Sequence, residues 1–454
     1  MQGAFDLVVK GGVVVGLTGR GQLDVYVREG KVVALEPPSR TMAASRTVDA
    51  DGLLVLPGMV DTHVHLMDPG DVTRENFPTG TLAAACSGVT TIIEHTHGWP
   101  VTSPDRLAEK RAHLRGRSYV DYGLAAHVWD DAAQDISGLW RRGVSFFKIF
   151  TCATHGVPAV THDRLSEVFD LLADLGAPAL VHCEDDQITS ASERRLHEAG
   201  RNDPGILPAW RSLPAELVAV GTVALLARLS GARVTIAHVS SPPVLELLRD
   251  EQLRGSPAVA ESCPQYLFLH EDEVYEHGAL RKFTPPARVR CTDDAQEMWR
   301  ALNSGAIHLL SSDHAPSTRE QKLAGDIWQA PFGLPGLDTT FRLMLDAALS
   351  GRTSLERVVG AYARAPARRY GLAGKGRLAP GADADLVLVD PSSQSLIADE
   401  GVHSKAGWTP YAGRAVRGSV VSVLLRGVPV VDNGRVVTAP SGQFMAGPGT
   451  VEED

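Results

Sequence analysis

Between residues 57 and 374, short apolar runs alternate with amphipathic stretches of helical length. Crossover helices that cover a parallel sheet produce this pattern. We count eight runs, which end near His65, Glu94, Val128, Phe150, Glu184, Val239, Cys263 and His314. Eight βα units predict an α/β fold of the (β/α)8 TIM-like barrel type. A doubly wound open sheet is the alternative, but the chain lacks the Gly-rich phosphate loop that such a sheet would need.

The two ends of the chain have a different texture. Residues 1–56 contain short β-type runs, such as 23–27 and 31–35, broken by turns that contain glycine. The same texture returns in residues 375–454, for example at 420–425. Such runs predict strands. Because the two segments are alike, we expect them to pair into one small β unit beside the barrel.

Composition narrows the functional class. The chain has 454 residues and a formal net charge of -10, with its basic residues scattered, so nucleic acid is not an expected partner. The sequence has no uninterrupted apolar run of about 18 residues and no secretory signal pattern, so we expect a cytoplasmic protein without a membrane segment. The cysteines are odd in number and form no CxxC pair, which argues against a disulfide framework. We expect each to be reduced, buried and small: Cys86, Cys152, Cys183, Cys263 and Cys291.

Candidate metal ligands stand at the polar ends of the apolar runs. Strand periodicity points His63 and His65 to one face of their run. His182 and His238 each end another run, and Asp313 does the same. In a barrel, these ends surround one mouth. Imidazole and carboxylate are ligands that zinc and similar ions favour, so the pattern predicts a metal site, with hydrogen-bonded core histidines as the alternative for the first pair.

Lys148 ends the apolar run 143–150, where a buried ammonium is costly and has no lone pair for a cation. Carboxylation of the neutral amine by CO2 removes this objection. The carbamate carries one negative charge and two oxygens, which can bridge two metals. The positive charge of two divalent ions would then be largely neutralised by the negative charges of the carbamate, Asp313 and a hydroxide.

Together these segments resemble the amidohydrolase superfamily, in the cyclic branch that contains hydantoinases, dihydropyrimidinases, allantoinases and dihydroorotases. The resemblance covers nearly the whole chain and rests on residues 56–65, 148–150, 181–185, 238–241, 261–267, 312–316 and 380–386. It implies that the two chain ends form a shared β-sandwich. It also implies two divalent metal ions, zinc first, with manganese, cobalt and iron as alternatives. One metal would be bound by His63, His65, Lys148 and Asp313, and the other by Lys148, His182 and His238, with Lys148 present as N6-carboxylysine.

The resemblance further implies a hydrolase that opens a cyclic amide by attack of a hydroxide shared by the two metals. Asp313 would take the proton from the water and deliver it to the leaving ring nitrogen. The substrate would be a small cyclic amide, and the protein a homodimer or homotetramer. Two other classes stay open: a non-catalytic scaffold relative, which would lack ligands that are all present here, and a hydrolase of acyclic amides, imides or esters.

Four positions bear on the ring and fit no single subfamily. Met67 stands where dihydroorotases place an arginine that grips the substrate carboxylate, and Ala153 stands where hydantoinases carry a tyrosine. Phe332 falls at their substrate-holding asparagine, and Thr284 where a small hydroxyl residue meets the ring amide. Met67 and Phe332 predict an apolar pocket wall, whereas residues 182–216 read most like allantoinases. We expect an allantoin- or hydantoin-like ring, with dihydroorotate or a cyclic imide as the alternative.

Other polar residues near the strand ends receive plainer interpretations. His95, His97, His155 and His314 are interpreted as supporting or loop residues, because two metals are already furnished with ligands. Glu184 and the two aspartates after it are interpreted as charges at a helix N-terminus.

Overall fold

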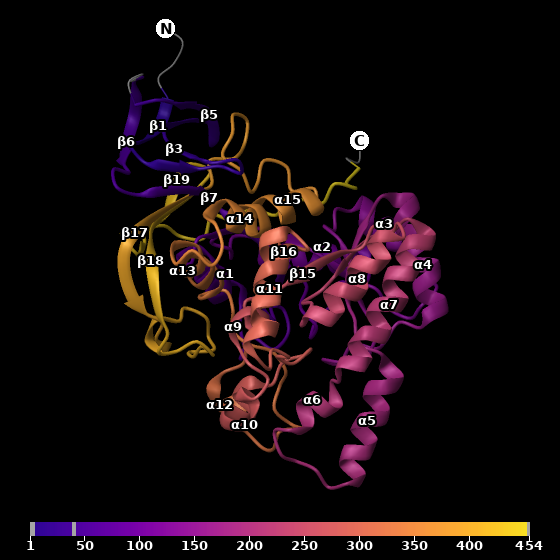
Figure 1. Ribbon diagram of the computed structural model, residues 1–454. Coiled ribbons are helices and arrows are strands. Elements are labelled where there is room, and N and C mark those ends of the chain that lie inside the picture. The colour runs from indigo at the N-terminus through magenta and orange to yellow at the C-terminus, as the bar shows by residue number, and fades with distance from the viewer. Residues whose placement is uncertain (1–4, 39–41, 452–454) are drawn as a thin grey trace.

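Strands from both ends of the chain pair side by side in the computed structural model, which describes residues 5–38 and 42–451 (Figure 1). Strand β7 (Leu54–Pro57) runs antiparallel to β17 (Leu386–Leu396), with Val55 opposite Leu388. They belong to a seven-stranded sheet of order β20-β19-β18-β17-β7-β2-β3. Its other strands are β2 (Val13–Val15), β3 (Arg20–Gln22), β18 (Ala415–Leu425), β19 (Val428–Asp432) and β20 (Arg435–Val436).

A four-stranded sheet completes the sandwich, in the order β5-β4-β1-β6. Its strands are β1 (Phe5–Lys10), β4 (Asp24–Arg28), β5 (Lys31–Glu36) and β6 (Ala44–Asp49). One apolar cluster joins the two sheets and mixes residues from both chain ends, among them Leu7, Val25 and Leu386. The predicted sandwich of both termini is therefore confirmed.

Eight parallel strand positions form the barrel, as predicted. They are β8 (Met59–Val64), β9 (Val89–Glu94), β10 (Asp121–Leu124) with β11 (Ala126–His127), β12 (Phe147–Phe150), β13 (Pro178–His182), β14 (Arg233–Ile236), β15 (Val259–Ser262) and β16 (Ile307–Leu310). The third position is interrupted at Ala125, so the barrel divides into runs β10-β9-β8 and β11-β12-β13-β14-β15-β16. The barrel closes where the His65 N–H donates to the carbonyl of His314.

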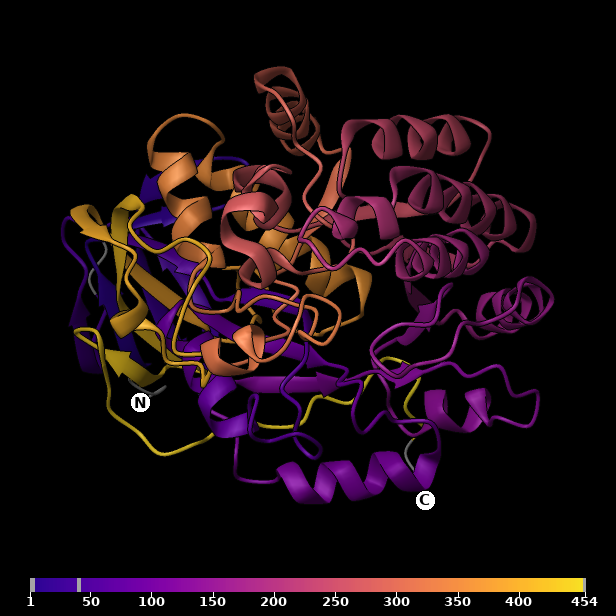
Figure 2. The ribbon, with the colours of Figure 1, turned by 90° about the horizontal axis from the view of Figure 1, so that it is seen from below.

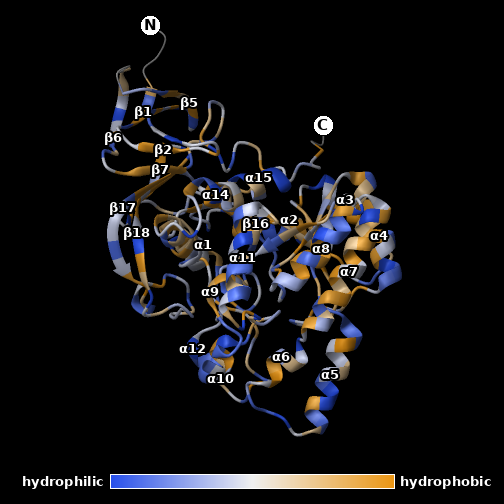
Figure 3. Cartoon of the chain, viewed as in Figure 1, coloured by the Kyte–Doolittle hydropathy of each residue, from blue (hydrophilic) through white to orange (hydrophobic). Residues whose placement is uncertain are grey.

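Helices surround these strands (Figures 1 and 2). They are α1 (Phe77–Cys86), α2 (Pro104–Leu114), α3 (Ile136–Arg141), α4 (His162–Leu175), α5 (Asp186–Glu198), α6 (Ile206–Trp210), α7 (Leu213–Ser230), α8 (Pro242–Leu253), α9 (Gln265–Phe268), α10 (Glu273–His277), η1 (Gly278–Arg281), α11 (Thr292–Ser304), α12 (Arg319–Leu323), α13 (Thr340–Leu349), α14 (Leu355–Val359), η2 (Gly360–Arg364), α15 (Ala365–Arg369) and η3 (Asp399–Gly401). Helix α11 turns a hydrophilic face outward (Figure 3) and buries Met298, Trp299 and Leu302.

One helical stretch among the described residues, Ile206–Ser230, is long and apolar enough to cross a membrane by length and composition. Most of it is α7, which packs on α4, α8 and β14 of the barrel. Its Glu216 carboxylate is buried and accepts a hydrogen bond from Arg288 Nε at 2.9 Å. A buried ion pair of this kind and the packing of α7 on its neighbours are typical of a helix inside a folded domain.

After β20, the chain leaves the sandwich and returns to the barrel (Figure 2). The N–H of Tyr122 donates to the carbonyl of Gln443, and the N–H of Gly447 donates to that of Gly143. The backbone of Gly449 packs against the indole of Trp140, and a Cβ added at this position would come within 2.2 Å of the ring. The last described residues thus tie the sandwich and the barrel together.

Candidate metal centre

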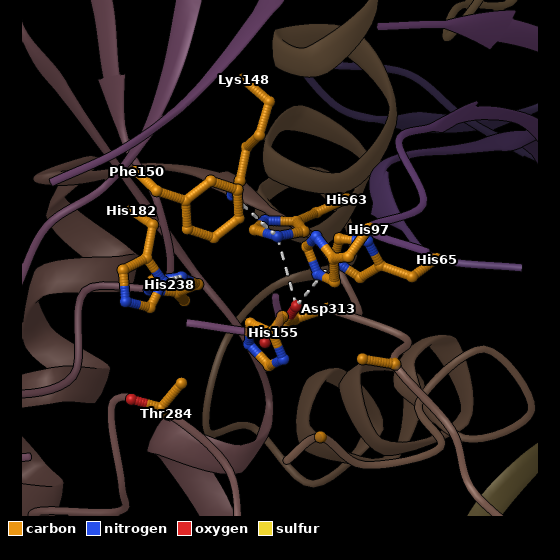
Figure 4. Close-up of a pocket in the computed structure, with 12 residues that line it drawn as sticks. His63, His65, His97, Lys148, Phe150, His155, His182, His238, Thr284 and Asp313 are labelled. Atoms are coloured by element: carbon orange, nitrogen blue, oxygen red, sulfur yellow. Dashed lines mark hydrogen bonds and ion pairs between the residues drawn. The ribbon is translucent and has the colours of Figure 1, made fainter. Parts of the chain in front are cut away.

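All six predicted ligands line one pocket at the carboxyl ends of the barrel strands (Figure 4). Strands β8, β12 and β13 deliver His63, Lys148 and His182, and the segments that follow β8, β14 and β16 deliver the remaining three ligands. Parallel strands place their carboxyl ends at one face of a barrel, so ligands far apart in sequence converge there. The six are His63, His65, Lys148, His182, His238 and Asp313.

Four of these side chains form the first group of converging donor atoms. Asp313 Oδ1 lies 3.2 Å from His63 Nε2 and 3.6 Å from His65 Nε2. Lys148 Nζ lies 3.3 Å from His63 Nε2. All are buried, and burial lowers the pKa of both imidazoles well below the usual value. Neutral imidazoles beside a carboxylate are a ligand set for a divalent cation.

The second group joins two histidines from neighbouring strands. His182 Nδ1 lies 2.9 Å from His238 Nε2. Burial also lowers the pKa of both rings, so both are neutral at pH 7. Figure 4 shows this pair on one side of Lys148 and the pair His63 and His65 on the other. The lysine therefore lies between the two groups.

In the first group, hydrogen bonds from Nδ1, the ring nitrogen that faces away from Asp313, fix the orientation of both imidazoles. His65 Nδ1 lies 2.9 Å from the carbonyl oxygen of His95, which only accepts, so Nδ1 carries the proton and Nε2 keeps its lone pair. His63 Nδ1 lies 2.7 Å from Glu261 Oε1 at the end of β15. Metal-binding histidines are commonly oriented in this way by an acceptor behind the ring.

Glu184 orients His182 in the second group. Its Oε2 lies 2.8 Å from His182 Nε2 and accepts the proton of that nitrogen, so Nδ1 keeps its lone pair and accepts from His238 Nε2. Burial disfavours the charged carboxylate, but Arg211 and the hydrogen bond from His182 together hold the pKa of Glu184 at about 2. The helix-terminus interpretation is thus wrong for Glu184, although it holds for Asp185, whose side chain accepts from the N–H of Ile188 and caps α5.

These observations test whether the residues fit two metal ions. Four imidazoles, a carboxylate and an amine are buried together, and three of the rings have their outer nitrogen fixed by an acceptor. The nitrogens of these rings that face the pocket lie close to other possible ligand atoms: His63 Nε2 is 3.2 Å from Asp313 Oδ1, and His182 Nδ1 is 2.9 Å from His238 Nε2. The donor set therefore fits a binuclear metal site.

Burial also shifts the two charged ligands toward their neutral forms. It lowers the pKa of the Lys148 ammonium, against the attraction of Asp313 and Glu261. It raises the pKa of the Asp313 carboxyl to about 7, with Lys148 opposing the shift. A neutral amine is the form of lysine that can react with CO2, and a carboxyl with a pKa near neutrality can both take and give a proton.

His97 and His155 line the same pocket, although their sequence positions suggested only supporting roles. Their rings stack at 4.6 Å with an interplanar angle of 11°. The pocket wall also includes Phe150, so three flat rings lie beside the ligands. Spacing in the sequence could not reveal this, because the two histidines come from loops after different strands.

The residues predicted to contact the substrate lie at different depths. Thr284 lines the pocket and donates to Glu184 Oε2 at 2.6 Å. Phe332 lies behind His155, with ring centroids 5.8 Å apart. Met67 is buried outside the pocket lining, where its sulfur accepts a hydrogen bond from Thr96.

Ala153 is exposed and also lies outside the pocket lining; its N–H donates to Asp186. Of the four positions, Thr284 is thus the one that the geometry brings to the metal ligands.

Two buried lysines hold the loop that carries Phe332. Lys322 Nζ donates to the carbonyls of Lys282, Pro331 and Gly333. Lys282 Nζ donates to the carbonyl of Ile327 and lies 4.4 Å from the centroid of the Phe332 ring. The hydrogen bonds from the two lysines therefore fix the loop that carries Phe332 at the edge of the pocket.

Comparisons with known proteins agree with this geometry. The Amidohydrolase family model matches residues 54–430. The chain is 37% identical over 449 residues to an allantoinase of Rubrobacter xylanophilus, covering 97% of this chain and 98% of that one. It is 33% identical over 452 residues to an allantoinase of Escherichia coli, covering 97% and 99%.

Among solved structures, the L-hydantoinase (dihydropyrimidinase) of Arthrobacter aurescens superposes with a TM-score of 0.93 and 33% identity, over 97% of this chain and 100% of that one. A shared fold, a matching family model and full-length relatives of one chemical class agree with the ligand geometry. The chain therefore belongs to the amidohydrolase family and is a cyclic amidohydrolase.

Proposed function

We propose that this enzyme hydrolyses a ring amide bond of allantoin. The observation that carries the proposal is the likeness to allantoinases along 97% of the chain, at 37% identity in the Rubrobacter protein. That likeness extends through all eight barrel strands, which position the pocket.

The residues that line the pocket are suited to the ring of allantoin. Allantoin is a planar five-membered ring with a polar ureido substituent. The rings of Phe150, His97 and His155 offer flat surfaces, and the two imidazoles and the Thr284 hydroxyl offer polar partners. Met67 lies outside the lining, so the apolar wall expected from Met67 and Phe332 is replaced near the ligands by imidazoles. A polar substituent is better accommodated by such a wall.

Each ligand has a proposed role. His63, His65, Lys148 and Asp313 would hold one divalent ion, and Lys148, His182 and His238 the other, with Lys148 as N6-carboxylysine and zinc as the metal. When bound, the two ions lower the pKa of water and polarise the substrate carbonyl. Burial favours the neutral Lys148 amine, which supports reaction with CO2.

Asp313 is the proposed catalytic residue. It takes a proton from water as the water oxygen bonds to the ring carbonyl carbon, and it gives that proton to the ring nitrogen as the carbon–nitrogen bond breaks. The product is one open chain, in which the broken amide bond has become a carboxylate and a second ureido group beside the original ureido substituent. Its raised pKa, about 7, supports both transfers near neutral pH.

Substrate contacts follow from the placement of the four predicted positions. Thr284 would contact the ring directly, and Phe332 would support His155 from behind. Met67 and Ala153 would act indirectly, through Thr96 and Asp186.

The wider organisation of the protein is also part of the proposal. We assign residues 1–56 and 375–454 to the sandwich unit and 57–374 to the barrel, with the segment 443–449 of the sandwich unit folded back onto the barrel. Residues 1–4, 39–41 and 452–454 lie outside the described part of the chain. A cytoplasmic homodimer or homotetramer is the proposed form.

Hydantoin is the second candidate ring, favoured by the TM-score of 0.93 with the L-hydantoinase. A turnover screen of zinc-, manganese- and cobalt-loaded protein decides between them, with allantoin, hydantoins, dihydrouracil, dihydroorotate and cyclic imides as substrates. We expect the highest kcat/KM with allantoin. A higher value with hydantoins would transfer the assignment to the second candidate, and a higher value with dihydroorotate would reject both.

A further inference from the structure

His95 carries a buried imidazole whose two ring nitrogens are unpaired. It directly follows β9, the second barrel strand, is 1% exposed and does not line the pocket. Neither nitrogen has a hydrogen-bond partner among the described residues. Burial lowers the pKa of the ring, so it is neutral, with one N–H and one lone pair. Because buried polar groups are normally paired, this ring is suited to a ligand that the chain itself does not supply.

The backbone of His95 is fixed to the segment that carries the first two metal ligands. Its N–H donates to the carbonyl of Val64 at 3.0 Å, and its carbonyl accepts from His65 Nδ1 at 2.9 Å. Since Val64 lies between His63 and His65, these bonds hold the His95 ring beside both imidazoles. The ring itself makes no hydrogen bond to a described residue, so it can shift without breaking one.

Three imidazoles therefore converge at this point. The ring centroid of His95 lies 4.8 Å from that of His63 and 4.5 Å from that of His65, and the last two are 5.3 Å apart. One nitrogen of each ring lies within 4.8 Å of those of the other two. Imidazoles that share a zinc ion at about 2.1 Å have nitrogens about 3.4 Å apart and centroids about 5 Å apart. The centroids already fit, and ring shifts of about 1 Å would bring the nitrogens together.

The hydrogen bonds also decide which nitrogens are left for an ion. Nδ1 of His63 is taken by Glu261, and Nδ1 of His65 by the carbonyl of His95. Both rings therefore offer Nε2, the nitrogen that faces Asp313. Because His95 does not line the pocket, a bond from it to an ion would leave the pocket side to water and substrate.

We propose that His95 is a third imidazole ligand of the first metal ion, beside His63 and His65. Its place in the sequence suggested only a supporting role. The inference rests on the proposed metal centre and adds a ligand to it. Three imidazoles and the Asp313 carboxylate would then surround the first ion without any contribution from Lys148.

This ligand makes the two metal sites unequal. Apart from Lys148, the second ion has only His182 and His238. The first ion should therefore bind before the lysine is carboxylated, and the second only afterwards. In Lys148→Ala, one zinc ion per chain should remain bound, and X-ray absorption spectroscopy of that variant should count three imidazoles around it.

His127→Leu is the matched control for His95→Leu. His127 is also buried, both of its ring nitrogens lack a partner among the described residues, and its ring centroid lies 6.2 Å from that of His95. It does not belong to the three converging histidines. Leucine is close to histidine in volume, so each variant removes an unpaired polar group and should keep the Tm of the metal-free protein at or above its unaltered value.

Titration with a competing chelator measures the zinc affinity of the unaltered enzyme and of both variants. We expect His95→Leu to lower the affinity for the tighter-bound ion on the order of 100-fold, because one of its ligands is lost. His127→Leu should change the affinity of neither ion. These measurements need no substrate.

Reactive thiols check the fold of each variant. The expectation that all five cysteines are buried is wrong for two of them, since Cys86 is half-buried and Cys291 is exposed, whereas the other three are enclosed. A folded variant should expose at most these two thiols to dithionitrobenzoate, and an unfolded chain exposes all five. Both leucine variants should give the same count as the unaltered protein.

Equal zinc affinities in His95→Leu and His127→Leu would overturn the proposal. So would a count of two imidazoles around the ion in Lys148→Ala, or the loss of both ions from that variant. An unaltered enzyme that does not open allantoin, but whose two leucine variants differ in zinc affinity as expected, would support the third imidazole and reject only the proposed substrate.

Discussion

Nδ1 of His182 and Nε2 of His238 face each other across 2.9 Å in a buried site. Burial keeps both rings neutral. Because Glu184 occupies the outer nitrogen of His182, the inner nitrogen is the one left for a metal. His238 Nε2 then donates to that nitrogen, and a cation shared by the two rings would take the place of the proton between them.

Lys148→Ala should lower bound metal and turnover together, because it removes the proposed bridge between the two ligand groups. Added short carboxylic acids should restore part of the activity by supplying the missing oxygens. Elemental analysis and a ring-opening assay measure these effects. Lys405→Ala, a change in the loop after η3 outside the metal pocket, is the control. Unchanged metal content in Lys148→Ala would reject the bridging role.

Asp313→Asn should keep the fold and lose about 10²- to 10⁴-fold in kcat, since an amide cannot accept the proton from water. Circular dichroism checks the fold, and steady-state kinetics with allantoin check the rate. Near-normal turnover would refute the role of Asp313 in proton transfer.

Glu184→Gln should weaken metal binding by about 10- to 100-fold, because an amide orients the His182 ring less firmly and leaves Arg211 without its charged partner. Titration with a competing chelator measures the affinity. Glu198→Gln, an exposed change at the end of helix α5, which follows Glu184 in the chain, should leave the affinity unaltered. Equal affinities in the two variants would argue against the orienting role.

His155→Gly should raise KM for allantoin about ten-fold and change KM for unsubstituted hydantoin much less, if the imidazole contacts the ureido group. Glycine suits the positive φ of 55° at this position, so backbone strain is avoided. Each substrate serves as the control for the other. Equal changes in both KM values would remove His155 from recognition of the substituent.

The pair His403 and Asp338 should make stability depend on pH. The pKa of His403 is raised from 6.5 to about 10, so the folded state holds this proton more tightly than the unfolded state. The stabilisation is complete below pH 6.5, declines as pH rises, and is lost above pH 10. The Tm difference between the unaltered protein and His403→Gln should therefore shrink from pH 6 to pH 10.

The sequence alone was sufficient for the barrel, the sandwich and the six converging residues. Strand alternation and the polar ends of apolar runs are local properties, and a barrel brings every such end to one face. His63, Lys148 and Asp313 could therefore be grouped before any distance was known.

Only the tertiary structure decided what surrounds those residues. Glu261 orients His63 across 198 positions of sequence, and that contact depends on how the barrel closes. The stacking of His97 on His155 and the burial of Met67 outside the pocket depend on loop paths that periodicity does not specify. The same holds for Asp338 and His403, which lie 3.1 Å apart only because the segment after η3 packs on the barrel. Side-chain contacts between distant elements are set by packing, whereas the pattern along the chain records only which face each element buries.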